Sequence, residues 1–280
     1  MRTQKRGGEE KKMQNQWKSD MKPVMMTDDI AFVGGTPVSV HALIGRDGLI
    51  LIDSGYPGML SGVEENLRAL GLHLGDVRFV VHSHGHIDHY GSTAEIVRRT
   101  GAQTLIGRED ADIVDGRRDL SWAEELKLDR PEPFTPERTF SDGETLTLCG
   151  RTIRCVHAPG HTEGTYAFFI ETTVNGAPMT AAMHGGVGLG SMQRWFLEKR
   201  GLPLSLREDF IAGAQRLMDE RVDIVLGNHP QQNDTAGKTV RMNGAVNPFV
   251  DPSEWRRFLD SCARQVRSML DEEERTLRHS

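Results

Sequence analysis

The sequence lacks the features that mark several large classes of protein. No apolar run in its 280 residues approaches the ~20 residues that a membrane-spanning helix needs. Its 34 basic residues are outnumbered by 40 acidic ones, so no strongly basic face for nucleic acid is expected. Three cysteines, Cys149, Cys155 and Cys262, form no CxxC pair and no even set. They suit a reducing compartment, and we expect them to be small buried side chains.

The first 22 residues also lack an apolar segment of the kind that follows the early charges of a secretory signal. Residues 1–22 are polar and basic, which predicts a flexible N-terminal tail and a cytoplasmic protein. From Pro23 onward the pattern changes to short apolar runs separated by glycines. Residues 23–280 are therefore expected to form one folded domain.

The apolar runs predict strands and helices in a mixed order. Runs rich in Val, Ile and Leu between turn residues predict strands at residues 30–33, 38–44, 49–53, 77–82, 103–106, 146–149, 153–157, 166–170, 179–183 and 222–226. Helical spacing of apolar residues predicts helices at 60–70, 94–99, 206–220 and 252–270. Two packed sheets with helices outside would accommodate this order. The pattern alone supports only an α/β or α+β domain.

Four of the eleven histidines gather in residues 82–89, HSHGHIDH, directly after a predicted strand. Side chains two residues apart point to one side of an extended loop, so His84 and His86 can share a metal ion. Asp88 and His89 then turn toward a second position. Imidazole and carboxylate ligands suit zinc, and iron or manganese are acceptable alternatives. Accidental clustering on a polar surface is the competing interpretation.

Four residues cannot complete two metal sites, so further ligands must come from distant parts of the chain. His161 follows a predicted strand ending at residue 157, and His229 follows the strand at 222–226. Loops at strand ends commonly meet at one rim of a sheet, which makes both histidines candidates. His41, His73, His157 and His279 are expected to be ordinary core or surface residues.

With these residues the sequence resembles the metallo-β-lactamase superfamily. The matching segments are LILIDSG (49–55), HSHGHIDHYG (82–91), APGHTEG (158–164) and GNHP (227–230), and they occur in the family's order. The resemblance implies an α+β fold, a four-layer αββα sandwich with metals at one edge of the sheets. The C-terminal part, with NPFVDP (247–252) and a final helix, is similar to the subclass-three metallo-β-lactamases.

The resemblance implies a specific set of ligands. His84, His86 and His161 would hold the first of two zinc ions, and Asp88, His89 and His229 the second. Asp53 matches an acidic residue that supports the ligand loop. His184 stands nearest the position of an Asp that bridges both metals in many relatives but is absent from subclass three. A role for His184 as an extra ligand, hydrogen-bonding group or substrate contact is therefore expected.

These residues predict a metallo-hydrolase of a small-molecule amide, lactam, lactone or ester. Attack would come from a metal-bound hydroxide that Asp88 orients. Tyr90 and Tyr166 are candidate proton donors or substrate contacts, with packing as the alternative, and Trp195 is a candidate apolar contact. A lactonase or a thioesterase of glyoxalase-II type is the main alternative, followed by a di-iron redox protein and a non-catalytic binding protein. The sequence leaves the oligomeric state open.

Overall fold

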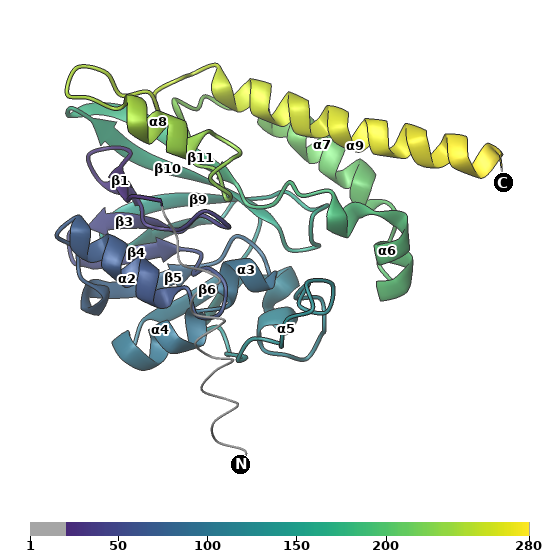
Figure 1. Ribbon diagram of the computed structural model, residues 1–280, viewed down its shortest axis with the longest axis horizontal. Helices are drawn as coiled ribbons and strands as arrows, with labels where there is room; N and C mark the ends of the chain where they lie inside the picture. Colours follow the sequence, from purple (N-terminus) through teal and green to yellow (C-terminus); the bar gives the residue numbers. More distant parts are fainter. Residues whose placement is uncertain (1–20, 280) are drawn as a thin grey trace, which may run out of the picture.

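Two β-sheets packed face to face form the centre of the molecule (Figure 1). The computed structural model describes residues 21–279. The predicted tail, residues 1–22, lies outside the described residues apart from its last two positions. Helices cover the outer face of each sheet, so the order of layers is helix, sheet, sheet, helix. The αββα sandwich expected from the sequence is confirmed.

The first sheet has seven strands in chain order. They are β1 (Val24–Met25), β2 (Ile30–Phe32), β3 (His41–Gly45), β4 (Gly48–Ile52), β5 (Val77–Val81), β6 (Gln103–Gly107) and β7 (Arg138–Phe140). Neighbours from β1 to β4 run antiparallel, and β4 to β7 run parallel. The carboxyl ends of β4, β5 and β6 therefore lie at the same edge of the sheet.

The second sheet has five strands in the order β12-β11-β10-β9-β8. They are β8 (Thr145–Leu148), β9 (Arg151–His157), β10 (Tyr166–Val174), β11 (Ala177–His184) and β12 (Ile224–Val225). β8 to β11 run antiparallel, and β12 pairs parallel with β11. The ends of β9, β11 and β12 consequently share one edge with the start of β10.

Apolar side chains pack on both faces of each sheet. In β4, Ile50 and Ile52 face the second sheet, whereas Leu49 and Leu51 face the helices. A strand buried on both faces reads as a continuous apolar run, which is why LILI was a clear strand signal. In β10, Phe168 faces the first sheet and Phe169 packs against the helices behind the second.

The helices divide between the two outer faces and the loops. They are α2 (Leu60–Ala69), α3 (Ile87–Tyr90), α4 (Thr93–Thr100), α5 (Ala111–Val114), α6 (Arg194–Arg200), α7 (Leu206–Leu217), α8 (Thr235–Arg241) and α9 (Glu254–Arg278). α2 and α4 cover the first sheet, and α7 and α9 cover the second. Across the described residues, no helix combines the length and apolarity that a bilayer crossing demands.

Two predicted elements differ from the observed ones in instructive ways. The predicted strand at 38–44 begins only at His41, because residues 33–40 fold back on themselves through hydrogen bonds from Val33 to Val40 and from Gly35 to Val38. The last helix continues to Arg278, beyond the predicted end at residue 270. Its final residues are exposed and highly charged, so they carry no apolar periodicity.

Candidate metal centre

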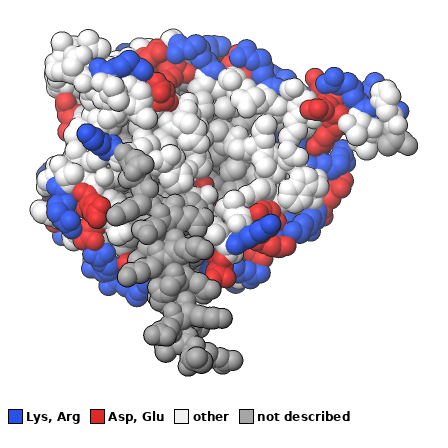
Figure 2. Space-filling view, in the orientation of Figure 1, with Lys and Arg blue, Asp and Glu red and all other residues white. Residues whose placement is uncertain are grey.

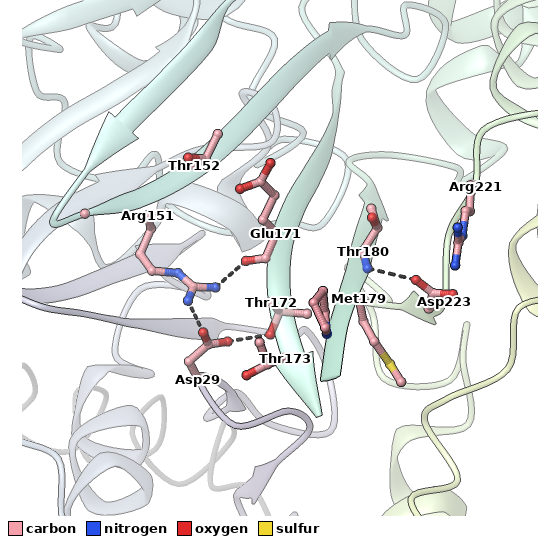
Figure 3. A pocket seen from close by; sticks show the side chains of 12 residues that line it. Asp29, Arg151, Thr152, Glu171, Thr172, Thr173, Met179, Thr180, Arg221 and Asp223 are labelled. Carbon is pink, nitrogen blue, oxygen red and sulfur yellow. Dashed lines mark hydrogen bonds and ion pairs between the residues drawn. The ribbon is translucent and has the colours of Figure 1, made fainter. Parts of the chain in front are cut away.

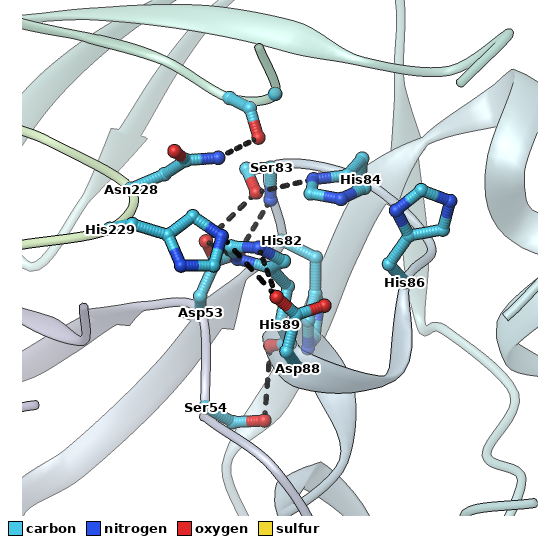
Figure 4. Close-up of polar contacts among 12 residues, drawn as sticks. Asp53, Ser54, His82, Ser83, His84, His86, Asp88, His89, Asn228 and His229 are labelled. Atoms are coloured by element: carbon cyan, nitrogen blue, oxygen red, sulfur yellow. Dashed lines mark hydrogen bonds and ion pairs between the residues drawn. The ribbon is translucent and has the colours of Figure 1, made fainter. Parts of the chain in front are cut away.

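The six candidate ligands and Asp53 meet at the shared edge of the two sheets. Figure 4 labels all of them except His161. Asp53 follows the end of β4, and His84 follows the end of β5. His161 lies in the loop between β9 and β10, and His229 lies just beyond β12. Loops from four strand ends thus assemble one site, as the positions after strands predicted.

A first cluster is formed by His84, His86 and His161, whose candidate ligand atoms lie within 4.8 Å of one another. Nδ1 of His86 is 3.0 Å from Nε2 of His161. The three rings are arranged nearly edge to face, with centroids 4.6 to 4.7 Å apart. Their ring nitrogens therefore converge on one small volume.

A second cluster shares His84 with the first and adds Asp88 and His89, again within 4.8 Å. Nε2 of His89 is 3.2 Å from Oδ2 of Asp88. Nε2 of His229 is 3.4 Å from the same oxygen. The structure therefore brings together all six residues that the sequence assigned to two sites.

Four of the imidazoles are anchored through Nδ1. His84 contacts the Ser83 hydroxyl at 3.1 Å, and His89 contacts Oδ2 of Asp53 at 2.8 Å. His161 donates to the Gly188 carbonyl at 2.8 Å, and His229 to the Pro37 carbonyl at 2.8 Å. An Nδ1–H donor leaves the lone pair on Nε2 free, so each ring presents an acceptor nitrogen to the centre.

The surroundings of Nε2 of His84 indicate whether these residues fit a metal ion. This atom is buried and has no hydrogen-bond partner among the described residues. Buried polar atoms are nearly always satisfied, so an orphaned nitrogen at the junction of both clusters needs a partner. Five imidazoles and one carboxylate are a donor set that zinc prefers. The residues therefore fit a bound metal ion.

Most of the histidines are held in the neutral form that a ligand requires. Burial lowers the pKa of His84 and His86 well below the usual value, and that of His161 to about 4. His89 differs: burial opposes its charge, but the carboxylates of Asp88 and Asp53 raise its pKa to about 10. Binding a metal at His89 must therefore displace a proton.

Asp53 positions a histidine of each cluster, His89 directly and His84 through Ser83. Its carboxylate accepts hydrogen bonds from the Ser83 backbone at 2.7 Å and the Ser83 hydroxyl at 2.8 Å. Because that hydroxyl donates to Asp53, its oxygen accepts from His84. Asp53 also accepts from His89, and its backbone has a φ of 64°, which is uncommon outside glycine. The supporting role proposed from the resemblance is consistent with these contacts.

Asp110 connects the two ligand loops, and it was not among the predicted site residues. Its buried carboxylate accepts hydrogen bonds from the Gly85 backbone at 2.8 Å, the Thr162 hydroxyl at 2.7 Å and the Gly164 backbone at 2.9 Å. Burial raises its pKa to about 6, against the effect of these bonds. An acid just after a predicted strand, at residues 103–106, was the one available signal.

A cavity of about 300 Å³ opens over the centre. His86, Asp88, His161 and His229 form part of its lining, and Trp122 and Gln231 lie on its sides. A larger hollow of about 780 Å³, shown in Figure 3, lies at the opposite ends of β9 to β11 around Arg151 and Asp223. No histidine lines it, so the smaller cavity is the one that adjoins the candidate metal centre.

The remaining predicted contacts lie outside this cavity. Tyr166 is buried between the sheets with its hydroxyl 3.1 Å from Glu109, and Tyr90 packs on Phe134. Their rings pack among apolar side chains. Trp195 is half exposed and reaches the cavity only through its contact with Trp122.

His184 belongs to neither cluster. It is buried, its Nδ1 accepts from the Gly186 backbone at 3.4 Å, and its ring packs on Phe210. His184, which was a candidate extra ligand, is thus a packed side chain at the end of β11. Trp122 and Ser191, which contact His86 and His161, were missed because contacts between distant loops leave no local pattern.

A sequence model described as the metallo-beta-lactamase superfamily matches residues 33–173. The crystal structure of BJP-1, a subclass B3 metallo-beta-lactamase of Bradyrhizobium japonicum, superposes with a TM-score of 0.84. That match covers 93% of this chain and 98% of BJP-1 at 24% identity, which shows a shared fold.

Two curated relatives are hydroxyacylglutathione hydrolases rather than β-lactamases. A hydroxyacylglutathione hydrolase of Anaeromyxobacter dehalogenans is 28% identical over 186 residues, covering 62% of this chain and 68% of the relative. Hydroxyacylglutathione hydrolase GloC of Haemophilus influenzae is 27% identical over 139 residues, covering 49% of this chain and 63% of the relative. The matched segment thus covers slightly more than two thirds of the length of the Anaeromyxobacter protein and slightly less than two thirds of the length of GloC.

Proposed function

The chain belongs to the metallo-beta-lactamase superfamily, and from this premise we propose that it is a dinuclear zinc hydrolase of a small carbonyl compound. The bond cleaved would be that of an amide, lactam, lactone or ester. The fold and the curated relatives both support a metallo-hydrolase. The two zinc ions and the class of bond that is cleaved are what we propose.

The observation that carries the proposal is the common orientation of the imidazoles. In this proposal His84, His86 and His161 hold one ion, and Asp88, His89 and His229 hold the other. Four rings are tied at Nδ1, and Nε2 of His84 is buried without a partner among the described residues. Such prior orientation of ligands lowers the cost of ordering them around an ion.

Bound zinc would supply Lewis-acid polarisation of the carbonyl and make water nucleophilic at neutral pH. The chain's own residues would position the reactants. Asp88 lines the cavity, so its carboxylate can accept a hydrogen bond from the attacking water and hold it toward the substrate. In the metal-free protein, His89 and His229 keep the pKa of Asp88 below its usual range despite burial, so its carboxylate is already ionised and available to a metal ion.

A thioesterase of glyoxalase-II type is the second candidate. The names of the two curated relatives favour it, because both are hydroxyacylglutathione hydrolases. Their sequence identity to this chain is 27 to 28%, and the matches cover about half to two thirds of the chain. The two candidates share a metal centre and differ in what the cavity above it accepts.

A substrate panel on zinc-loaded protein tests the proposal. The panel contains a β-lactam, an acyl lactone, an aryl ester and a glutathione thioester. His86→Ala should lower turnover of any accepted substrate by at least about 100-fold, because a ligand is lost. His73→Ala, at an exposed position, should leave turnover unchanged. Inertness of the zinc-loaded protein toward the whole panel would contradict the proposal.

A small molecule is the only kind of partner proposed. Basic and acidic side chains alternate along the outline of the face shown in Figure 2. With a formal net charge of −6, this distribution favours neither nucleic acid nor an anionic membrane surface.

A further inference from the structure

The cavity over the metal centre has no cationic lining among the described residues. Among the described residues, Asp88 is the one carboxylate that lines it, and no lysine or arginine does. The other polar groups are neutral, chiefly the amides of Asn228, Gln231 and Gln232. A carboxylate placed away from the metal centre would therefore find no ion-pair partner in this cavity, and burying an unpaired charge is costly.

The helix behind the cavity does not supply a free cation either. α6 packs against Trp122 through Phe196, with ring centroids 4.4 Å apart. All three of its cationic side chains are engaged by carboxylates: Arg194 with Glu273, Lys199 with Glu124, and Arg200 with Glu124 and Glu125. Because Glu124 and Glu125 on the Trp122 loop balance these cations, α6 leaves no unpaired cation beside the cavity.

One side of the cavity is apolar. Trp122, Leu126 and Val187 line it, and the ring of Trp122 lies 5.7 Å from that of His86. Leu126 is 39% exposed, and the neighbouring Trp195 is 51% exposed. Large apolar side chains left open to solvent beside a cavity mark a surface for an apolar ligand.

The backbone holds Trp122 in place at a conformational cost. Its φ of 66° is a genuine outlier for a bulky residue, and such strain gathers at functional sites. Gly190 makes room for the indole, since a Cβ there would lie 2.9 Å from Trp122 Cζ2. The strained backbone of Trp122 and the space that Gly190 leaves for its indole together indicate that the position of this ring is specifically maintained.

We propose that the site takes a neutral ester or lactone whose apolar acyl chain lies along Trp122, Leu126 and Val187, and that it discriminates against acyl groups that carry a carboxylate. This inference rests on the proposed function and narrows it. The reactive carbonyl lies at the floor of the cavity beside Asp88 and His161, and the chain extends toward Leu126. A glutathione thioester, with two carboxylates and no cation to receive them, is a poor match.

A matched pair of esters tests the proposal on zinc-loaded protein. 4-Nitrophenyl hexanoate and 4-nitrophenyl hemiadipate have acyl chains of the same length, and only the second ends in a carboxylate. We expect kcat/KM to be at least about tenfold higher for the hexanoate, since the cavity must desolvate the charge. Equal values, or a preference for the hemiadipate or a glutathione thioester, would overturn the inference and leave the hydrolase proposal standing. Inertness toward the whole carbonyl panel would overturn both.

Two pairs of variants assign the preference to this cavity. Trp122→Ala should raise KM for the hexanoate about tenfold with little change for the hemiadipate, while Trp122→Phe should retain the preference. Gln231→Lys introduces a cation at an exposed position on the rim, and Gln231→Met is its neutral control. The lysine variant should lower KM for the hemiadipate by about threefold or more. An unchanged preference in both Trp122→Ala and Gln231→Lys would overturn the assignment.

Discussion

Oδ2 of Asp53 lies 2.8 Å from Nδ1 of His89, and the same oxygen accepts the hydroxyl of Ser83 at 2.8 Å. The Ser83 oxygen in turn contacts Nδ1 of His84. One buried carboxylate thereby fixes a ligand from each candidate metal site. Loss of this carboxylate should weaken both sites together.

Asp53→Asn is predicted to reduce zinc affinity at both sites by about 10- to 100-fold. The amide keeps the left-handed backbone that Asn tolerates, but its NH₂ group cannot accept from Ser83 or His89. Competition with a chromophoric chelator measures the affinity. Asp47→Asn, at an exposed turn, is the matched control and should bind zinc as the parent does. Full affinity in Asp53→Asn would show that Asp53 does not position the ligands.

Asp110→Ala is predicted to lower the free energy of unfolding by about 3 kcal/mol. The substitution leaves the Gly85 and Gly164 N–H groups and the Thr162 hydroxyl without their buried acceptor. Urea denaturation of the metal-free protein measures the change, and Asp47→Ala should stay within about 0.5 kcal/mol of the parent. A loss of less than about 1 kcal/mol would mean that Asp110 does not hold the two loops together.

Gly186→Ala is predicted to displace His161 and weaken the first metal site. A Cβ at position 186 would lie 2.4 Å from Cδ2 of His161, closer than real contacts allow. Gly62→Ala, in α2, meets nothing within 4 Å and serves as the control. Zinc stoichiometry should fall below two only in Gly186→Ala. Two tightly bound ions in that variant would place the first site elsewhere.

His41 is predicted to make the protein sensitive to acid. Burial lowers the pKa of His41 to about 4, against about 6.5 in an unfolded chain. Below pH 6.5 the unfolded state therefore binds more protons, so stability contributed by neutral His41 is lost as the pH falls from 6.5 toward 4. The full loss amounts to about 3 kcal/mol.

His41→Gln isolates this effect, because the amide can still donate to the Gly227 carbonyl, which lies 3.1 Å from Nε2 of His41. Unfolding free energies of the metal-free protein at pH 7 and pH 5 should differ less in His41→Gln than in the parent. His73→Gln, at an exposed position, should keep the parental difference. Identical pH dependence in His41→Gln and the parent would contradict the prediction.

The strands that position the site could be predicted from the sequence because they are buried on both faces. Leu49 to Ile52 is an apolar run, and Val77 to Val81 is apolar apart from the exposed Arg78. Asp53 and the histidine-rich segment follow directly after these strands. His161 and His229 were identified in the same way, because each follows a predicted strand, at residues 153–157 and 222–226. The αββα arrangement itself came from the family resemblance, since the order of elements left more than one fold open.

Residues that act across loops could not be found in this way. Asp110 contacts residues 25 and 54 positions away, and Trp122 meets Trp195 across a gap of 73 residues. The expectations for Tyr90, Tyr166 and His184 rested on nearness in sequence to ligands or strand ends. The pleat of β10 and β11 instead turns Tyr166 into the space between the sheets and His184 onto Phe210.

Zinc-edge anomalous diffraction from crystals of the zinc-loaded protein, with elemental analysis of the same sample, tests the dinuclear centre most directly. Two ions per chain are predicted, one among His84, His86 and His161 and the other among Asp88, His89 and His229. A single ion, or an ion that leaves His161 or His229 without a metal contact, would contradict the proposed centre.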